Sequence, residues 1–172
     1  MAPFAASPEA PVKLLLVLRH AAAAGKSAGE DRDRPLTPEG RRAAQSIGRR
    51  LKSDGLAPDR ILCSPAQRAR ETLAAIGTSL DALPPADFDE MLYLADPVTL
   101  LAHIRAVPAE AHCLLLIGHN PGLEELVRAL AGSSSSALRS GLPAAGLAIF
   151  EISTTWAGLS RSTARLADFV AP

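Results

Sequence analysis

Two histidines in this 172-residue chain stand where apolar runs end. His20 comes directly after the run 14–18 and Arg19, and His119 follows the run 113–117 after one glycine. A neutral imidazole nitrogen can act as a nucleophile or carry a proton near neutral pH. A guanidinium group can hold a phosphoryl group through paired hydrogen bonds. These residue types, in this pairing, indicate chemistry on a phosphate.

A second arginine belongs beside them. Arg68 lies in the first turn of a helix that is expected to start at the cap residue Ser64, directly after a short strand. The first amide groups of a helix lack intrahelical partners, so an anion is favoured at that end. We therefore expect Arg68 to join Arg19 and the two histidines. The alternative is that it pairs with Glu71 or Thr72 on its own helix.

Alternating strand and helix signals place these residues in an α/β fold. Apolar runs bounded by turn residues indicate buried strands, and a capping residue followed by proline marks a helix start. The expected strands are 14–18, 60–63, 113–117, 146–152 and 164–169, and the expected helices are 38–55, 65–80, 97–107 and 121–130. This order predicts a three-layer sandwich, with a mainly parallel central sheet and helices on both faces. The carboxyl ends of its parallel strands would gather both histidines in one crevice.

The ends of the chain and its charge limit the remaining classes. Residues 1–11 are rich in alanine and proline and predict a flexible N-terminal arm, whereas 12–172 predicts a single domain. With 18 basic and 18 acidic side chains, the chain has no large positive field that would attract nucleic acid or an anionic membrane. It also has no apolar stretch of the roughly 20 residues that span a bilayer. A cytoplasmic protein is expected.

Composition also bears on cofactors and assembly. Cys63 and Cys113 lie in or beside apolar runs, where free cysteine usually packs as a small hydrophobic residue. Two such thiols make no disulfide framework and fit a reducing compartment. No cluster of metal-binding residue types stands out, so we expect neither a metal nor another cofactor, and we expect a monomer.

Four stretches resemble the histidine phosphatase superfamily, also called phosphoglycerate mutase-like. They are Leu16 to His20, Arg34 to Gly40, Ser64 to Thr72 and Gly118 to Pro121. Their order, the shortness of the chain and the absence of a large insertion after the second helix are most similar to the phosphohistidine phosphatases of the SixA type. Four motifs in the same order are far more specific than one.

The resemblance implies a role for each of four residues. His20 would attack phosphorus and carry a covalent phosphohistidine intermediate, which water then hydrolyses. Arg19 and Arg68 would clamp the phosphoryl group, while His119 would bind it and pass a proton. Because side chains supply the positive charge, the reaction needs no metal in principle.

Glu90 and Arg34 are further candidates, and each has an open alternative. Glu90 could be the acid that protonates a leaving oxygen, or a surface carboxylate on its loop. Arg34 could bind phosphate from the polar loop 21–35, or it could form a surface salt bridge with Asp31 or Asp33.

The leading hypothesis is a metal-independent phosphatase for phosphohistidine in a partner protein, since an imidazole leaves phosphorus far more easily than an alkoxide does. The alternative in the same class is a phosphatase for small phosphate monoesters, which requires Glu90 to be catalytic. A third hypothesis is a module that binds phosphate or a phosphoprotein without turnover. Relatives usually carry glycine after the Arg-His pair, and Ala21 at that position suggests this last reading.

Overall fold

The computed structural model describes residues 12–25, 30–132 and 139–171, so the expected arm at 1–11 lies outside the described residues. A six-stranded sheet forms the centre, in the strand order β3-β2-β4-β1-β5-β6. Its strands are β1 (Lys13–Arg19), β2 (Arg60–Cys63), β3 (Ala86–Phe88), β4 (Cys113–Gly118), β5 (Leu147–Ile152) and β6 (Ala164–Val170). The first four are parallel, and β5 and β6 add an antiparallel edge. The mainly parallel sheet is confirmed.

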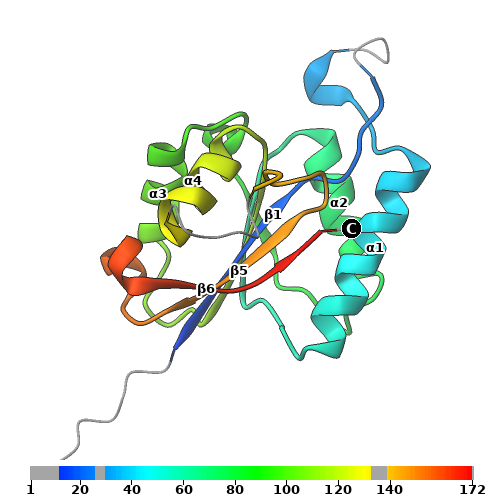
Figure 1. Ribbon diagram of the computed structural model, residues 1–172. Helices are drawn as coiled ribbons and strands as arrows, with labels where there is room; N and C mark the ends of the chain where they lie inside the picture. The colour runs from blue at the N-terminus through cyan, green and yellow to red at the C-terminus, as the bar shows by residue number, and fades with distance from the viewer. Residues whose placement is uncertain (1–11, 26–29, 133–138, 172) are drawn as a thin grey trace, which may run out of the picture.

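Four helices cover the two faces of the sheet (Figure 1). They are α1 (Pro38–Ser53), α2 (Gln67–Gly77), α3 (Pro97–Arg105) and α4 (Gly122–Ala131). Helices α1 and α2 lie on one side, and α3 and α4 lie on the other, as the three-layer prediction requires. In the described part of the chain, none of the helices has both the length and the apolar character needed to cross a bilayer.

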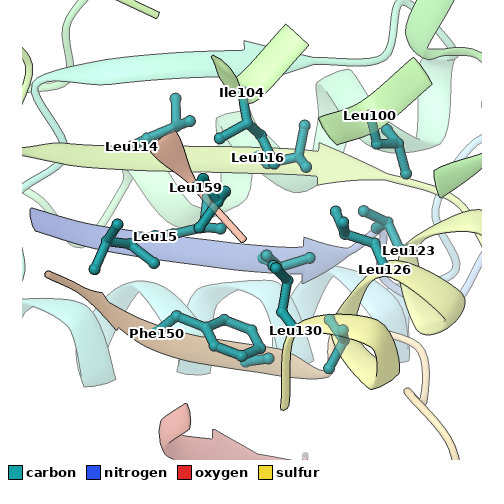
Figure 2. Packing of buried hydrophobic residues seen from close by; sticks show 14 of the residues in the cluster. Leu15, Leu100, Ile104, Leu114, Leu116, Leu123, Leu126, Leu130, Phe150 and Leu159 are labelled. Carbon is teal, nitrogen blue, oxygen red and sulfur yellow. The ribbon is translucent and has the colours of Figure 1, made fainter. Parts of the chain in front are cut away.

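The central strands supply side chains to both layers, because successive residues of a strand point to opposite faces. Leu15 and Val17 of β1 pack toward α3 and α4, whereas Leu16 and Leu18 pack toward α1 and α2. Figure 2 shows the first of these layers, in which strand residues Leu15, Leu114, Leu116 and Phe150 face helix residues Leu100, Ile104, Leu123, Leu126 and Leu130. Each fully buried leucine contributes about 2 kcal/mol. This packing on both faces holds the ends of β1 and β4 in place.

Helix α1 starts where the sequence predicts. The Thr37 hydroxyl accepts a hydrogen bond from the Gly40 amide at 3.0 Å, and Pro38 is the first helical residue. A capping hydroxyl and a proline that needs no amide partner together make this start unambiguous.

Helices α2 and α4 start later than expected, and β3 was not predicted. Helix α2 begins at Gln67 rather than at residue 65, and the Ser64 hydroxyl accepts from the Ala66 amide and also contacts His119. Helix α4 begins at Gly122, and Asn120 does not cap it, because its side-chain oxygen has no hydrogen-bond partner among the described residues while its amide group donates to Glu124 and Leu142. Strand β3 has three residues, too few for a periodic pattern.

Two glycines let helix starts touch neighbouring backbone. A Cβ atom on Gly40 of α1 would lie 2.1 Å from the carbonyl oxygen of Ala22, and one on Gly122 of α4 would lie 1.9 Å from that of Ala95. Both distances are far below van der Waals contact, so only glycine fits at these positions. The two contacts fix the segments that follow β1 and precede α3.

Candidate active site

A polar cleft of about 700 Å³ opens at the carboxyl ends of β1 and β4. Residues from both strand ends, the loop after β1, helix α2 and two later segments line it. They are Arg19, His20, Ala22, Ala23, Asp31, Arg34, Arg68, Leu94, His119, Asn120 and Ala144. The structure thus brings together the two histidines and two arginines first singled out in the sequence, with Arg34 beside them.

His20 presents a nitrogen lone pair in the cleft. Its Nδ1 atom lies 2.8 Å from the carbonyl oxygen of Ala21, and its Nε2 atom lies 3.2 Å from Arg68 Nε. A carbonyl only accepts and a guanidinium only donates, so Nδ1 carries the hydrogen and Nε2 carries the lone pair. Burial lowers the pKa of His20 to about 4, and the charge of Arg68 adds to this. The ring is therefore neutral near pH 7, which a nucleophile requires.

His119 lies beside His20, with the ring centroids 5.1 Å apart. It is only 3% exposed, and burial, followed by the neighbouring His20, lowers its pKa to about 3. Its Nε2 atom lies 2.7 Å from Ser64 Oγ, whereas its Nδ1 atom is buried and has no hydrogen-bond partner among the described residues. The sequence predicts Ser64 only as a helix cap, so this contact was missed.

Arg68 connects the nucleophile to the loop after β1. The side chain is almost fully buried, and its Nε atom donates to His20. Its two terminal nitrogens donate to the carbonyl oxygen of Asp31 at 2.5 Å and to the Asp31 carboxylate at 3.0 Å. Its guanidinium pairs with neither Glu71 nor Thr72, so the alternative of a pair on its own helix is wrong.

Asp31 is a cleft residue that the sequence did not identify. It stands on a short turn, η2 (Asp31–Asp33), and its carboxylate accepts hydrogen bonds from Arg34, Arg68 and the Tyr93 hydroxyl. The Tyr93 bond, followed by the guanidinium groups, holds the pKa of Asp31 well below its usual range, so the carboxylate is ionised. Arg34 pairs with Asp31, as one of its two alternatives expects, and it also lines the cleft, whereas its binding of phosphate stays a prediction.

Arg19 is anchored at the opposite side of the cleft. One terminal nitrogen donates to the carbonyl oxygen of Leu142 at 2.9 Å, and Asn120 Nδ2 donates to the same oxygen and to Glu124. Burial lowers the pKa of Arg19, and the Glu124 carboxylate opposes this shift. These bonds tie the end of β1 to the start of α4 and so orient the guanidinium.

Glu90 is not among the residues that line the cleft, so the structure favours the second of its two alternatives, a surface carboxylate. Its turn, η3 (Glu90–Leu92), buries Leu92 and leaves the Glu90 side chain 68% exposed. There it pairs with Arg32, and this contact lowers the pKa of Glu90. An exposed carboxylate that is already ionised is a poor proton donor. The surface alternative describes this residue.

The charge of the cleft suits an anion. Three guanidinium groups face one ionised carboxylate and two neutral imidazole rings. Across residues 12–25, 30–132 and 139–171, no group of three or more histidine, cysteine, aspartate or glutamate side chains is placed to hold a metal ion. The donors present fit phosphoryl oxygens directly.

Comparisons with known proteins agree with this geometry. A model of the histidine phosphatase superfamily (branch 1) matches residues 15–93. An uncharacterized protein of Mycobacterium tuberculosis is 36% identical over 161 residues, which cover 90% of this chain and 99% of that protein. A solved structure from Nakamurella multipartitia, named "Putative Phosphohistidine Phosphatase SixA", is 35% identical, covers 96% of this chain and 99% of its own, and has a TM-score of 0.83. The chain belongs to the histidine phosphatase superfamily.

Within this superfamily the chain is of the SixA type. A second structure with the same SixA name, from Agrobacterium tumefaciens, is 33% identical, covers 93% of this chain and 99% of its own, and has a TM-score of 0.80. These matches confirm the phosphoglycerate mutase-like fold that the resemblance implied. As a member of this superfamily, the protein is a hydrolase of the phosphatase type.

This histidine phosphatase carries Ala21 where relatives usually carry glycine, and the alanine does not obstruct the cleft. Ala21 is fully buried, and its amide donates to Thr72 Oγ1 at 3.0 Å. Its methyl group belongs to the core layer beneath α1 and α2, and the residue does not line the cleft. The feature that suggested binding without turnover therefore leaves the phosphate site untouched.

Proposed function

We propose that this histidine phosphatase removes the phosphoryl group from phosphohistidine in a partner protein, without a metal ion and through a covalent intermediate on His20. The proposal is supported by the His20 lone pair, which lies in a cleft with three arginines. The carboxylate in the same cleft is ionised and has no proton to donate. Asp31 is the acidic residue among the described residues that line this cleft, and it is ionised. Glu90, the other candidate acid, faces solvent.

In the first step, the lone pair on His20 Nε2 attacks phosphorus, and the bond between phosphorus and the substrate ring nitrogen breaks. The bonding pair leaves with the substrate ring, which departs as neutral imidazole because its other ring nitrogen already carries a proton in the phosphohistidine that is attacked. In the free protein, Arg68 Nε–H covers the attacking lone pair at 3.2 Å. An entering phosphoryl oxygen competes for this N–H and frees the nucleophile, while Arg19 and His119 stabilise the charge on the other oxygens.

In the second step, water attacks the phosphorus bound to His20, inorganic phosphate leaves, and Nε2 recovers its electron pair. Imidazole is the leaving group in both steps, so positioning and positive charge can lower both barriers. An alkoxide leaves much less readily and needs an acid to protonate it. The ionised Asp31 and the distant Glu90 therefore favour phosphohistidine over small phosphate esters.

The rim of the cleft supports a protein substrate. Leu94 lines the cleft and is half exposed, and Met91, three residues earlier, is exposed as well. Apolar side chains on a surface favour contact with another protein. A partner surface that presents phosphohistidine to the cleft would contact Leu94, which lines it.

The proposal is tested by phosphate release from a phosphohistidine-bearing protein and from a panel of phosphate esters, with a chelator present throughout. Wild type and Glu90→Gln are compared with Glu110→Gln, a control at the far end of the sheet. We expect rapid P–N cleavage in all three proteins, with rates within about twofold, because a solvent-exposed acid contributes little to the reaction. Ester hydrolysis is expected to be slow.

Two results would contradict this. Turnover confined to esters and lost in Glu90→Gln would identify a small-molecule phosphatase. Dependence of P–N cleavage on added divalent metal in the chelated protein would overturn the metal-free mechanism.

A further inference from the structure

A buried serine, which is not among the residues that line the cleft, contacts His119. Ser64 follows the last residue of β2 and is fully buried, and its Oγ atom lies 2.7 Å from His119 Nε2. Its amide donates to the carbonyl oxygen of Ile117 at 3.0 Å, which places the serine beside the end of β4. Two neighbouring strands therefore fix the serine and the histidine relative to each other.

The hydrogen bonds around Ser64 determine which nitrogen of His119 is protonated. The hydroxyl oxygen already accepts a hydrogen bond from the Ala66 amide at 3.3 Å. Its own hydrogen needs an acceptor, and within the described part of the chain His119 Nε2 is the one that contacts it. If Nε2 were protonated instead, the serine hydrogen and the lone pair on Nδ1 would both be buried without partners, which is costly.

We propose that Ser64 is a positioning residue that donates to His119 Nε2 and so holds His119 in the tautomer protonated on Nδ1. The buried Nδ1–H, which has no partner among the described residues, is then the group offered to a phosphoryl oxygen in the cleft. This inference rests on the proposed function only in naming phosphate as the ligand. Burial keeps the ring neutral, so its tautomer decides whether it attracts or repels an anion.

The two histidines then have the same protonation but opposite uses. His20 binds the Ala21 carbonyl through Nδ1–H and presents the lone pair of Nε2. His119 is held at Nε2 by Ser64 and presents the hydrogen of Nδ1. The nucleophile faces phosphorus with electrons, and its neighbour faces a phosphoryl oxygen with a proton.

The direct test is the tautomer of His119 in the full-length wild-type protein. Nitrogen-15 labelled histidine and long-range proton–nitrogen NMR correlations near neutral pH distinguish protonated from unprotonated ring nitrogens, and His119→Asn assigns the signals. We expect an unprotonated Nε2 and a protonated Nδ1. A protonated Nε2 in the wild type would overturn the proposal without recourse to any variant.

Variants at residue 64 test whether the serine is the cause. Ser64→Ala is expected to give a mixture of His119 tautomers and about tenfold weaker binding of inorganic phosphate, because one hydrogen bond to the anion is lost in part of the population. Ser64→Thr keeps a hydroxyl and should restore both readouts. Ser79→Ala, which removes a hydroxyl bonded to a backbone carbonyl at the far end of α2, is the control.

These readouts separate this inference from the proposed function. Neither the tautomer nor phosphate binding requires turnover, so the expected tautomer in a protein that does not hydrolyse phosphohistidine would refute the proposed function alone. An unchanged tautomer and unchanged phosphate affinity in Ser64→Ala would refute the role of Ser64 alone.

Discussion

The cleft has two walls that are built differently. The strand-end wall consists of Arg19, the last residue of β1, and of His20 and His119, which follow β1 and β4, two parallel strands that pair in register. The loop wall consists of Asp31 and Arg34, which are held by side-chain contacts on a short turn. The first wall is fixed by the sheet, whereas the second depends on ion pairs. The nucleophile is thus placed by the sheet, and the surrounding charge is placed by a loop.

Arg68 joins the two walls. Its Nε atom donates to His20 on the strand-end wall, and its terminal nitrogens donate to Asp31 on the loop wall. The tyrosine bond to Asp31 further ties the loop wall to the segment after β3. The Tyr93 ring also lies edge-on to His119 of the strand-end wall, with the ring centroids 5.4 Å apart, so Arg68 and Tyr93 both connect the two walls.

The largest effect is expected from removing the nucleophile of the strand-end wall. His20→Ala should lower phosphohistidine hydrolysis by at least about 1000-fold, because no other described group presents an attacking lone pair beside the arginines. Circular dichroism and thermal unfolding should match the wild type, since His20 is a partly exposed residue at a strand end. Unchanged rates in a folded variant would refute the covalent mechanism.

Replacing the residue that joins the walls should come next. Arg68→Lys keeps the charge but loses the fork that contacts His20 and Asp31 together, so kcat/KM should fall about 100-fold. The matched control is Arg70→Lys on the same helix, whose guanidinium lies over the Phe88 ring instead. Equal losses in both variants would show that Arg68 has no special place in the cleft.

A smaller effect is expected from the loop wall. Asp31→Asn removes the negative charge between Arg34 and Arg68, so inorganic phosphate should inhibit about threefold more strongly while kcat falls about tenfold because Arg68 loses its anchor. Asp33→Asn makes the same charge change two residues away on an exposed side chain and serves as the control. If kcat and phosphate inhibition are both unchanged, the loop wall plays no part in the reaction.

Sequence patterns were sufficient for the strand-end wall and insufficient for the loop wall. Arg19, His20 and His119 could be predicted, because their strands are buried on both faces and the carboxyl ends of parallel strands meet. The bond between Asp31 and Tyr93 could not, since it joins residues 62 positions apart through a loop without periodicity. The contacts that decide such pairs are formed only when the whole fold is complete.

Sequence patterns do not define the contacts of Ser64 and Glu90, because each residue type occurs in more than one kind of position. A serine before a proline is a typical helix cap, yet the Ser64 hydroxyl contacts His119, which follows β4. Glu90, for which a cleft position and a surface position were both open, is turned outward, because Leu92 takes the buried position on the same turn. Both cases concern the direction of a side chain, which sequence spacing alone does not define.

The smallest effect concerns stability and pH. The pKa values of His20 and His119 fall to about 4 and 3 in the folded protein from 6.5, so between pH 6.5 and 4 the unfolded chain binds more protons. The free energy of unfolding should therefore decrease as pH falls through this window. Asp31, whose pKa is depressed, loses its own stabilising contribution only below this window, as pH falls past 3.8.

The predicted decrease in the free energy of unfolding can be measured by urea unfolding of the wild type and His119→Asn at several pH values between 7 and 4. The variant should lose less stability across the window, because one of the two buried imidazoles is gone. Equal slopes in the two proteins would show that His119 titrates normally when folded.

The glycine contacts at the starts of α1 and α4 have a consequence for mutational tolerance. In a library of all single substitutions, Gly40 and Gly122 should be as depleted as the nucleophile, although neither lines the cleft. The cause of depletion would differ, since their variants would lose soluble protein and those of His20 would lose only turnover. A screen that measures both protein abundance and hydrolysis would distinguish residues needed for folding around the cleft from residues needed for turnover.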